Sequence, residues 1–311
     1  MKLDLIALSN AMTDLTFEIT EEELSRLGLK KESYTPLRNL DQKLFSDIIH
    51  EKIFKLYPAG SPANVIINTS RLGLKKTGLY ATVGNDSFGE NYIRTIQQNN
   101  ITSLINTVDG KSGVCYIMIT PDGEKTTTAD IGVANQFDFD FSKLKDSRIF
   151  HTSGYELVTN PKKTKEAIEY AKKYNVKLSF DLADKAMIQR ERSSIEYLLK
   201  DIDILFATES EAEELTGKNP LNALKALSDY SGIVILKKGS QGSVVRRRVG
   251  HVSEEYRIPI IPVEVKSTCG AGDAYASGFL FAYLIGLPLD ECGNMGSEIA
   301  SRVCASDRPH L

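Results

Sequence analysis

Short apolar runs alternate with amphipathic helical patterns over most of the 311 residues of the chain. This alternation is typical of a layered α/β domain with a largely parallel sheet, because each helix carries the chain back over a sheet face to the next parallel strand. One helix start is well marked, since Asn160 provides an N-cap and Pro161 fits the first helical position. We expect strands at Leu3–Leu8, Thr77–Val83, Arg148–Thr152, Val176–Asp181, Ile202–Phe206 and Gly232–Lys237, and helices at Phe88–Gln98 and Ser210–Thr216.

Two segments do not follow this alternation. In residues 13–40, a β-like run at Leu15–Ile19 leads into a charged stretch rich in turns. In residues 101–130, two β runs flank the strong turn signal Pro121-Asp122-Gly123. We therefore expect one α/β domain over residues 1–311, with a small β lid built from 13–40 and 101–130 inserted in it.

Composition and charge exclude several kinds of partner. The chain is 41% hydrophobic and 25% charged with a formal net charge of −3, which is ordinary globular composition without the basic surface that nucleic acids or anionic membranes require. The densest basic run, Arg246–Arg248, falls in an expected strand or hairpin and is interpreted as a solvated face. The most apolar stretch, 274–287, is too short to span a bilayer, and the first apolar run is interpreted as a buried strand, not a signal peptide.

Four cysteines lie far apart, with no Cys-x-x-Cys pair among them. This spacing argues against a disulfide framework or a structural zinc site and fits a reducing compartment. We therefore expect a cytoplasmic protein without nucleic-acid or membrane partners. The four are Cys115, Cys269, Cys292 and Cys304.

The most informative motif is Gly270-Ala271-Gly272-Asp273, where a loop becomes a long apolar helix. Small residues leave the first N–H groups of the helix open, and the helix dipole adds positive charge, so this turn can bind an anion such as phosphate. An acid here is useful if Asp273 takes a proton from a hydroxyl that attacks the phosphate. Tight packing, with Asp273 complementing the dipole, is an equally good explanation of the tetrapeptide alone. A dinucleotide fingerprint fails because its third glycine would be Tyr275, and no Walker pattern occurs.

Two earlier segments offer polar groups near expected strand ends. Asp14 follows the first strand, where the ligand crevices of α/β folds form. The backbone amides of Gly60 and Ser61 and the side-chain amide of Asn64 can hold the paired hydroxyls of a polyol. The plainer alternatives are a turn residue for Asp14 and a loop with a helix cap for the second segment.

Two later segments can serve a nucleotide and its metal ion. A run of glutamates after Thr208 starts a helix, and one of them, such as Glu211, can hold Mg²⁺ through water or simply complement the helix dipole. Lys238, Gly239 and Gly242 lie in a turn between two β runs. That turn is either an ordinary hairpin or one whose glycines leave room for a nucleotide.

The order of these segments resembles that of the ribokinase-like (PfkB) family of sugar and nucleoside kinases. The resemblance covers nearly the whole chain, and its most specific part is the Gly-Ala-Gly-Asp block. The matching segments are Asp14, Ala59–Asn64, Gly78–Gly89, Thr208–Gly217, Lys238–Ser243 and Thr268–Phe279, while Leu27–Thr35, Phe180–Asp184 and Arg302–Pro309 look most like the adenosine-kinase-like branch.

The resemblance implies a ribokinase-like three-layer α/β/α core with a mostly parallel sheet and a small β-sheet lid. It implies transfer of the γ-phosphate of ATP, with Mg²⁺, to a hydroxyl of a sugar or nucleoside. The implied site residues are Asp273 as general base; the N–H groups of Gly270, Ala271 and Gly272 as anion hole; Asp14, Gly60, Ser61 and Asn64 for the acceptor; Thr208, Lys238, Gly239 and Gly242 for the nucleotide; and Glu211 for the metal.

Two positions depart from the family pattern. Ser267 stands where the family has Asp, an acid that helps to form a monovalent-cation site in many members, so potassium activation is in doubt. Thr208 replaces the Asn of the family's Asn-x-x-Glu motif, which puts in doubt how water around Mg²⁺ and phosphate is arranged. These departures leave a second function open, a nucleotide- or metabolite-binding sensor without turnover.

The sequence leaves the acceptor open between a nucleoside such as adenosine and a sugar such as ribose or fructose. Aromatic residues of the expected lid, Phe17, Tyr34 and Tyr116, can stack on a base or fill a core. The family resemblance also favours a homodimer formed through the lid. A phosphate donor other than ATP is not excluded.

Overall fold

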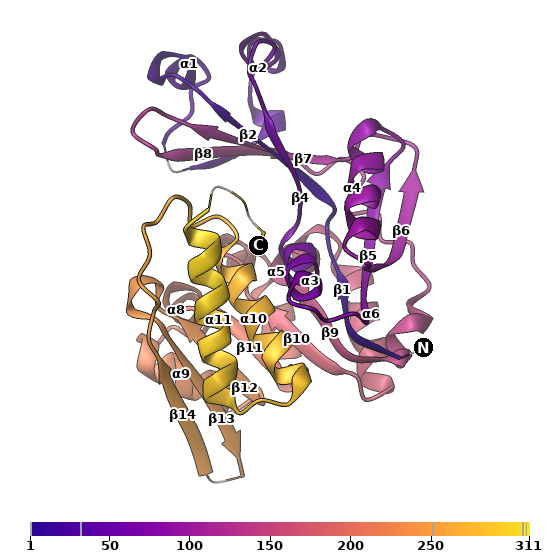
Figure 1. The fold of residues 1–311 in the computed structure, drawn as a ribbon, viewed down its shortest axis with the longest axis vertical. Coiled ribbons are helices and arrows are strands. Elements are labelled where there is room, and N and C mark those ends of the chain that lie inside the picture. Colours follow the sequence, from indigo (N-terminus) through magenta and orange to yellow (C-terminus); the bar gives the residue numbers. More distant parts are fainter. Residues whose placement is uncertain (1, 32, 251, 307, 309) are drawn as a thin grey trace.

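The computed structural model describes residues 2–31, 33–250, 252–306, 308 and 310–311. In these residues the chain forms a large sheet and a small sheet (Figure 1). The strands of the large sheet are β1 (Leu3–Leu8), β5 (Thr77–Gly84), β6 (Thr102–Val108), β9 (Ser147–Ser153), β10 (Lys177–Asp181), β11 (Ile204–Thr208), β12 (Ile233–Lys237), β13 (Ser243–Val249) and β14 (Val252–Ile258). Their spatial order is β14-β13-β12-β11-β10-β9-β1-β5-β6, and every neighbouring pair from β12 to β6 is parallel.

The expected parallel sheet is confirmed, and all the expected strands belong to it. In β5, every residue from Thr77 to Gly84 is buried, because helices cover the sheet on both sides. A strand buried on both faces consists of a nearly continuous apolar run. This explains why the positions of these strands could be predicted from the sequence.

The antiparallel pair β13 and β14 extends one edge of the large sheet. The basic run lies on β13, where Arg246 pairs with Glu255 and Arg247 pairs with Glu254 across the hairpin. These ion pairs support the interpretation of the run as a solvated face.

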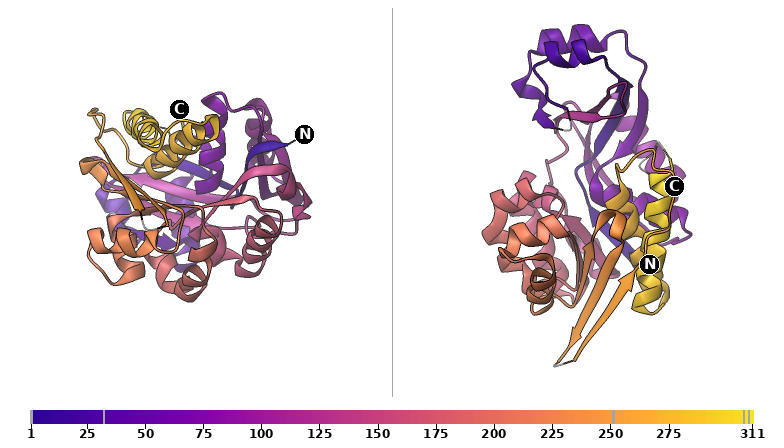
Figure 2. Two further views of the ribbon diagram at one scale, coloured as in Figure 1. Left: turned by 90° about the horizontal axis from the view of Figure 1, so that it is seen from below. Right: turned by 90° about the vertical axis from the view of Figure 1, so that its left-hand side faces the viewer.

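Helices cover both faces of the large sheet, so the core has three layers (Figure 2). One face is covered by α3 (Ser61–Arg71), α4 (Ser87–Gln98), α10 (Ala271–Ile285) and α11 (Leu289–Cys304), and the other by α5 (Gly154–Thr159), α6 (Pro161–Lys173), α7 (Lys185–Leu198), α8 (Glu209–Thr216) and α9 (Pro220–Ser228). No helix in the described part of the chain is long and apolar enough to cross a bilayer.

The small sheet has the order β3-β8-β7-β2-β4 and stands above the large one in Figure 1. Its strands are β2 (Met12–Glu18), β3 (Tyr34–Pro36), β4 (Lys55–Ala59), β7 (Gly113–Ile119) and β8 (Lys125–Asp130). One face packs against α1 (Glu21–Arg26) and α2 (Gln42–Ile49) through Phe17, Leu24, Phe45, Ile48 and Met118.

The strand content of the small sheet differs from the expected segments 13–40 and 101–130. β6 belongs to the large sheet, where it pairs with β5 from Gly78↔Thr102 to Gly84↔Val108, so the inserted segment begins only after it. β4 was not expected at all and forms an edge of the small sheet. Both are edge strands with largely exposed or half-buried residues, and an edge strand lacks the continuous apolar run of a buried one.

The small sheet lies at the edge of the large sheet where the parallel strands have their carboxyl ends. The chain leaves β1 at Leu8 and enters β2 at Met12, so only three residues separate the two sheets. The carboxyl ends of β10, β11 and β12 bring Asp181, Thr208 and Lys237 to the same edge. In open α/β sheets, this edge is where ligands bind.

Candidate active site

Asp273 is the third residue of α10, just after Gly270, which ends the preceding loop in a left-handed conformation (φ 75°). Its two carboxylate oxygens accept hydrogen bonds from the start of α3, one from Ser61 Oγ at 2.7 Å and one from Asn64 Nδ2 at 2.8 Å. Burial raises the pKa of Asp273 to about 6, although both hydrogen bonds oppose the rise. The site therefore holds a carboxyl group that can exchange a proton near neutral pH.

The turn before Asp273 offers open backbone donors. The N–H of Ala271 donates to the Thr268 carbonyl at 3.2 Å, whereas the N–H groups of Gly270 and Gly272 have no partner within the described residues. The ammonium group of Lys237 lies beside the turn, because a Cβ atom built on Gly272 would be 3.3 Å from Lys237 Nζ. Open amides at a helix N-terminus next to a cation form a place for an anion.

Lys237 pairs with one buried carboxyl group beside this turn and is influenced by the charge of a second, Glu211. Its Nζ lies 2.8 Å from Asp181 Oδ2. Burial opposes the charge of Lys237, but Asp181 and Glu211 together outweigh it and raise the pKa of Lys237. The ammonium group therefore stays charged inside the site.

Glu211 and Thr208 form a capping box at the start of α8. Glu211 Oε2 accepts from the Thr208 N–H at 2.8 Å, and Thr208 Oγ1 accepts from the Glu211 N–H. Thr208 thus fills the N-cap role for which Asn, Ser and Thr are all suited. Burial, followed by the charge of Asp181, raises the pKa of Glu211.

A divalent cation fits the charge balance of this cluster. Asp181, Glu211 and Asp273 face one ammonium group, Lys237, so the carboxyl groups carry an excess of negative charge. In the described part of the chain, no three His, Cys, Asp or Glu side chains are grouped closely enough to cage a metal ion. Mg²⁺ commonly binds through one or two carboxylates, water and substrate phosphates, and this donor set can support that kind of binding.

Asp14 faces Asp273 from the small sheet. It lies on β2 opposite Tyr57 of β4 and Cys115 of β7. Burial raises the pKa of Asp14 to about 7, and the negative charge of Asp273 adds to the rise. The charges of the two carboxyl groups therefore influence each other where the small sheet stands over the core.

Gly60 is the N-cap residue of α3 and lies against the connection between β1 and β2. Its φ is 116°, and a Cβ atom there would lie 2.2 Å from the Asn10 carbonyl oxygen and 2.7 Å from Ser9 Oγ. Asn10 is itself held by buried Glu156, which accepts from both its N–H and its Nδ2 at 2.9 and 3.0 Å. Only glycine allows this close approach, which places Ser61 and Asn64 against Asp273.

The three expected lid aromatics lie on different faces of the small sheet. Phe17 and Tyr116 belong to the core under α1 and α2, with Tyr116 packed edge-on against Phe45 at 4.9 Å. Tyr34 pairs in register with Thr127, and Thr127 with Ile117, so Tyr34 shares the face that carries Asp14. Of these three residues, Tyr34 is the one available to a ligand.

The turn with Lys238, Gly239 and Gly242 connects β12 to β13. Gly242 is required by packing, since a Cβ atom there would lie 2.1 Å from the Ile258 carbonyl oxygen. Gly239 has φ 55° and nothing within 4 Å of its Cβ position, and Lys238 Nζ pairs with Glu209 at 3.4 Å. The open space at this turn is therefore next to Gly239.

Ser267 accepts a hydrogen bond from a lysine of the small sheet. Its Oγ accepts from Lys125 Nζ on β8 and from the Cys269 N–H at 3.1 Å. Lys125 faces Ile119, on the side of the sheet that carries Asp14. A monovalent cation does not fit beside Ser267, because the serine has no charge to attract it and Lys125 already supplies a positive one.

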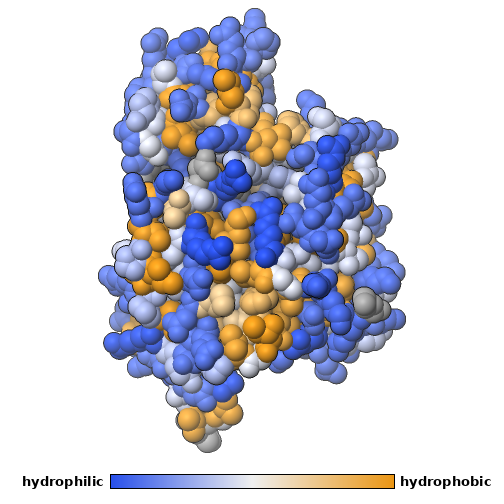
Figure 3. Space-filling view, in the orientation of Figure 1, coloured by the Kyte–Doolittle hydropathy of each residue, from blue (hydrophilic) through white to orange (hydrophobic). Residues whose placement is uncertain are grey.

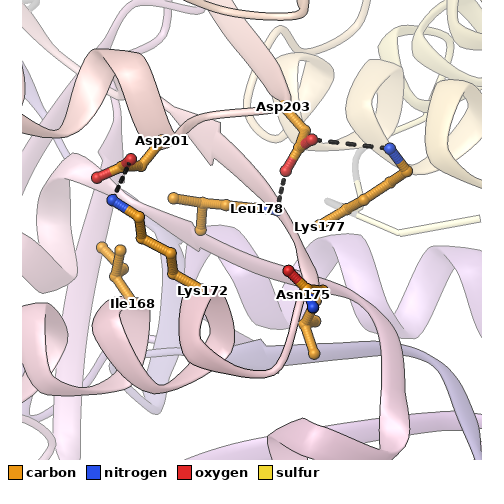
Figure 4. Close-up of a pocket in the computed structure, with 8 residues that line it drawn as sticks. Ile168, Lys172, Asn175, Lys177, Leu178, Asp201 and Asp203 are labelled. Carbon is orange, nitrogen blue, oxygen red and sulfur yellow. Dashed lines mark hydrogen bonds and ion pairs between the residues drawn. The ribbon is translucent and has the colours of Figure 1, made fainter.

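Two surface pockets lie away from this site. One, of about 280 Å³, lies at the amino end of β10. Figure 4 shows that Lys172 pairs there with Asp201 and Lys177 with Asp203, so these charges already have partners. The other, of about 340 Å³, lies beside Leu287 past the far end of α10. Figure 3 shows apolar side chains gathered over that end of α10, opposite the end that carries Asp273.

Several site residues were not singled out from the sequence. Asp181 and Lys237 end two parallel strands, and a rule that inspects every strand end at the carboxyl edge would have found them. Lys125 and Glu156 carried no comparable signal, because their roles depend on segments more than a hundred residues away.

Comparisons with known proteins identify the family of the chain. A family model described as pfkB family carbohydrate kinase matches residues 32–308. The ATP-dependent 6-phosphofructokinase of Thermoanaerobacterium thermosaccharolyticum is 28% identical over 262 residues, covering 80% of this chain and 79% of that protein. The 5-dehydro-2-deoxygluconokinase 2 of Bacillus cereus is 27% identical over 274 residues, covering 81% of each.

Solved structures show the same fold. The adenosine kinase from Sinorhizobium meliloti is 25% identical, with a TM-score of 0.89 over 100% of this chain and 96% of that chain. A probable sugar kinase from Rhizobium etli is 24% identical, with a TM-score of 0.88 over the same shares. Because the family model matches most of its length, the chain belongs to the pfkB family of carbohydrate kinases and is a phosphotransferase that acts on an alcohol group.

Proposed function

We propose that the protein transfers the γ-phosphate of ATP to a hydroxyl group of a sugar or nucleoside, with Asp273 as the general base. The observation that carries this proposal is the buried Asp273 carboxyl group, with a pKa of about 6, beside the open N–H groups of Gly270 and Gly272. A carboxylate next to an anion site would only repel a phosphate unless it accepts a proton. A base of near-neutral pKa does this efficiently at pH 7.

The reaction is a displacement at phosphorus. Asp273 accepts the proton of the acceptor hydroxyl, the hydroxyl oxygen forms the new P–O bond, and the bond to the bridging oxygen breaks so that ADP leaves. The N–H groups of Gly270 and Gly272 and the ammonium group of Lys237 stabilise the negative charge that spreads over the transferring group. The Ala271 N–H, which bonds to Thr268, would join them if the turn opens by a small amount.

The nucleotide side of the proposed site lies along the ends of β11 and β12. Thr208 at the end of β11, the open turn at Gly239 and the neighbouring Lys238 would contact the nucleotide, and Gly242 would hold the shape of that turn by its packing. Mg²⁺ supplies positive charge to the phosphates when bound. Glu211 and Asp181 would hold it, since their excess negative charge is only partly balanced by Lys237.

The acceptor side of the proposed site lies between α3 and the small sheet. Ser61 and Asn64 now bond to Asp273, and an acceptor hydroxyl entering between them would take over those bonds. Gly60 keeps the start of α3 against the β1–β2 connection, and Asp14 would contact the acceptor from the small sheet. The small sheet would exclude water when it closes over the acceptor.

Known relatives act, by their names, on sugar-like acceptors and on adenosine. The exposed ring of Tyr34 on the Asp14 face suits a flat base, whereas paired polar groups suit sugar hydroxyls. A panel of adenosine, ribose, fructose, fructose 6-phosphate and 5-dehydro-2-deoxygluconate in an ADP-release assay distinguishes these acceptors.

Asp273→Asn tests the proposed base. We expect turnover on the best acceptor to fall by about 10²–10⁴-fold, with acceptor binding by calorimetry largely retained. Asp290→Asn, which removes an acid from the first turn of α11 outside the site, is the matched control and should keep its turnover. If Asp273→Asn keeps most of its activity, Asp273 is not the base. Ligand binding without ADP release on any acceptor would instead favour the sensor.

A further inference from the structure

The last residues of the chain lie along one side of α3. Asn64, Asn68 and Arg71 occupy positions i, i+4 and i+7 of the helix, so they share a face. Asn64 Oδ1 lies 2.8 Å from His310 Nε2, Asn68 Oδ1 accepts from the Leu311 N–H at 2.9 Å, and Arg71 Nη1 donates to the Leu311 carbonyl at 2.7 Å. His310 is 5% exposed and lies against α3, the helix whose Asn64 bonds to Asp273.

The direction of the Asn64 amide follows from its two partners. An ionised carboxylate accepts hydrogen bonds but donates none, so the amide NH₂ must point at Asp273 Oδ2. The amide oxygen then points at His310, and Nε2 of that ring must carry a hydrogen. Burial and the nearby charge of Arg71 lower the pKa of His310 to about 3, so the ring is neutral and has one N–H to give.

We propose that His310 is a positioning residue for the catalytic carboxylate, acting through Asn64. By donating from Nε2 to Asn64 Oδ1, it prevents the amide from turning over and keeps the NH₂ group directed at Asp273. Without that donor, the amide can rotate and present its oxygen to the carboxylate, which leaves Ser61 as the one side-chain donor to Asp273 among the described residues. The tail thereby takes part in the site although it is distant from it in the sequence.

This inference rests on the proposed function only in treating Asp273 as the base. The hydrogen-bond relay makes a separate prediction for the protein without substrate, because a hydrogen bond to the ionised form of a carboxyl lowers its pKa. Loss of the hydrogen bond from Asn64 should therefore raise the pKa of Asp273.

His310→Phe removes the donor while keeping a ring in the buried position. We expect the Asp273 titration to move up by about one pH unit, from about 6 toward 7. The acidic limb of kcat/KM should move with it, so that the rate at pH 6 falls by about fivefold while the rate at pH 8.5 changes little. A role in folding alone would lower the rate equally at both pH values.

Two variants separate the donor from general docking of the tail. His310→Gln places an amide N–H near the position of Nε2 and should restore the wild-type titration. Arg71→Gln loosens Leu311 but keeps the His310 donor, so it should leave the titration unchanged.

The decisive measurement is the titration of Asp273 in the intact apoprotein, followed by ¹³C NMR of carboxyl-labelled aspartate and assigned with Asp273→Asn. The acidic limb of kcat/KM is then compared on whichever of adenosine, ribose and fructose is phosphorylated. A shift with His310→Phe that His310→Gln reverses supports the proposal, even if no acceptor is phosphorylated and the proposed function fails. An unchanged titration in His310→Phe, no recovery in His310→Gln, or an equal shift in Arg71→Gln would overturn it.

Discussion

At the scale of single residues, the site holds near one another carboxyl groups whose negative charges repel. Asp14 from the small sheet and Asp273 from α10 both have raised pKa values, about 7 and about 6, and burial is the main cause for each. A folded state that holds two such groups is less stable when both are ionised. That cost comes with the proposed role of Asp273 as a base whose pKa lies near neutral pH.

Asp14→Asn should stabilise the protein at alkaline pH. The folded-state pKa of about 7 lies above the ordinary value of 3.8, so the folded protein binds more protons in this window and its stability falls as the pH rises from about 4 to 7. Removing the charge should raise the free energy of unfolding by about 1–3 kcal/mol at pH 8, by less at pH 5, and by very little at pH 4. Urea midpoints for wild type and variant at these pH values check the trend, and a gain that is equal at all three would contradict it.

At the scale of elements, the geometry of the site depends on where α3 begins. Gly60 approaches the Asn10 carbonyl so closely that no Cβ atom fits, and the buried Glu156 holds Asn10 in place from below. The helix start therefore cannot shift without disturbing the β1–β2 connection. This fixed start allows Ser61 and Asn64 to reach Asp273.

Gly60→Ala should be far more harmful than a glycine substitution at an open turn. We expect it to lower the free energy of unfolding by about 2–4 kcal/mol and to weaken acceptor binding, since both φ and space forbid the new methyl group. Gly239→Ala is the matched control, because Gly239 also has positive φ but open space, and it should cost about 1 kcal/mol. Equal losses in urea denaturation of the two variants would show that the close contact with Asn10 is not limiting.

At the scale of the whole molecule, the small sheet and the core are linked across the site by Lys125 and Ser267. The lysine comes from β8 and the serine from the loop before α10, so the contact ties the covering sheet to the turn with the open amides. We expect the positive charge of Lys125 to take the place of a monovalent cation at Ser267.

Turnover should therefore be the same within about twofold in sodium, potassium or tetramethylammonium chloride. Lys125→Gln should lower turnover by about tenfold, equivalent to ~1.4 kcal/mol of transition-state stabilisation, because it removes the charge beside the turn. Lys31→Gln makes the same charge change on the same part of the molecule, where Lys31 pairs with Glu21 and Asp122 outside the site, and should have little effect. Strong activation of the wild type by potassium, or equal losses in the two variants, would refute this role for Lys125.

By itself the sequence determined the α/β class, the strands of the parallel sheet and the glycine-containing helix start at Gly270–Asp273. Buried parallel strands and helix starts are local patterns: a continuous apolar run or a Gly-x-Gly before an apolar helix can be read without knowing what lies opposite. The places of the edge strands β4 and β6 were not predicted, because many of their residues are exposed or half-buried and form no continuous apolar run.

Only the tertiary structure decided which polar residues meet at the site. Lys237 reaches Asp181 from another strand, Lys125 reaches Ser267 from another sheet, and His310 reaches Asn64 from the end of the chain. Each pairing joins residues between 56 and 246 positions apart. Hydrogen bonds and charges act over a few ångströms in space, and no spacing in the sequence encodes such a distance until the sheet order has brought the segments together.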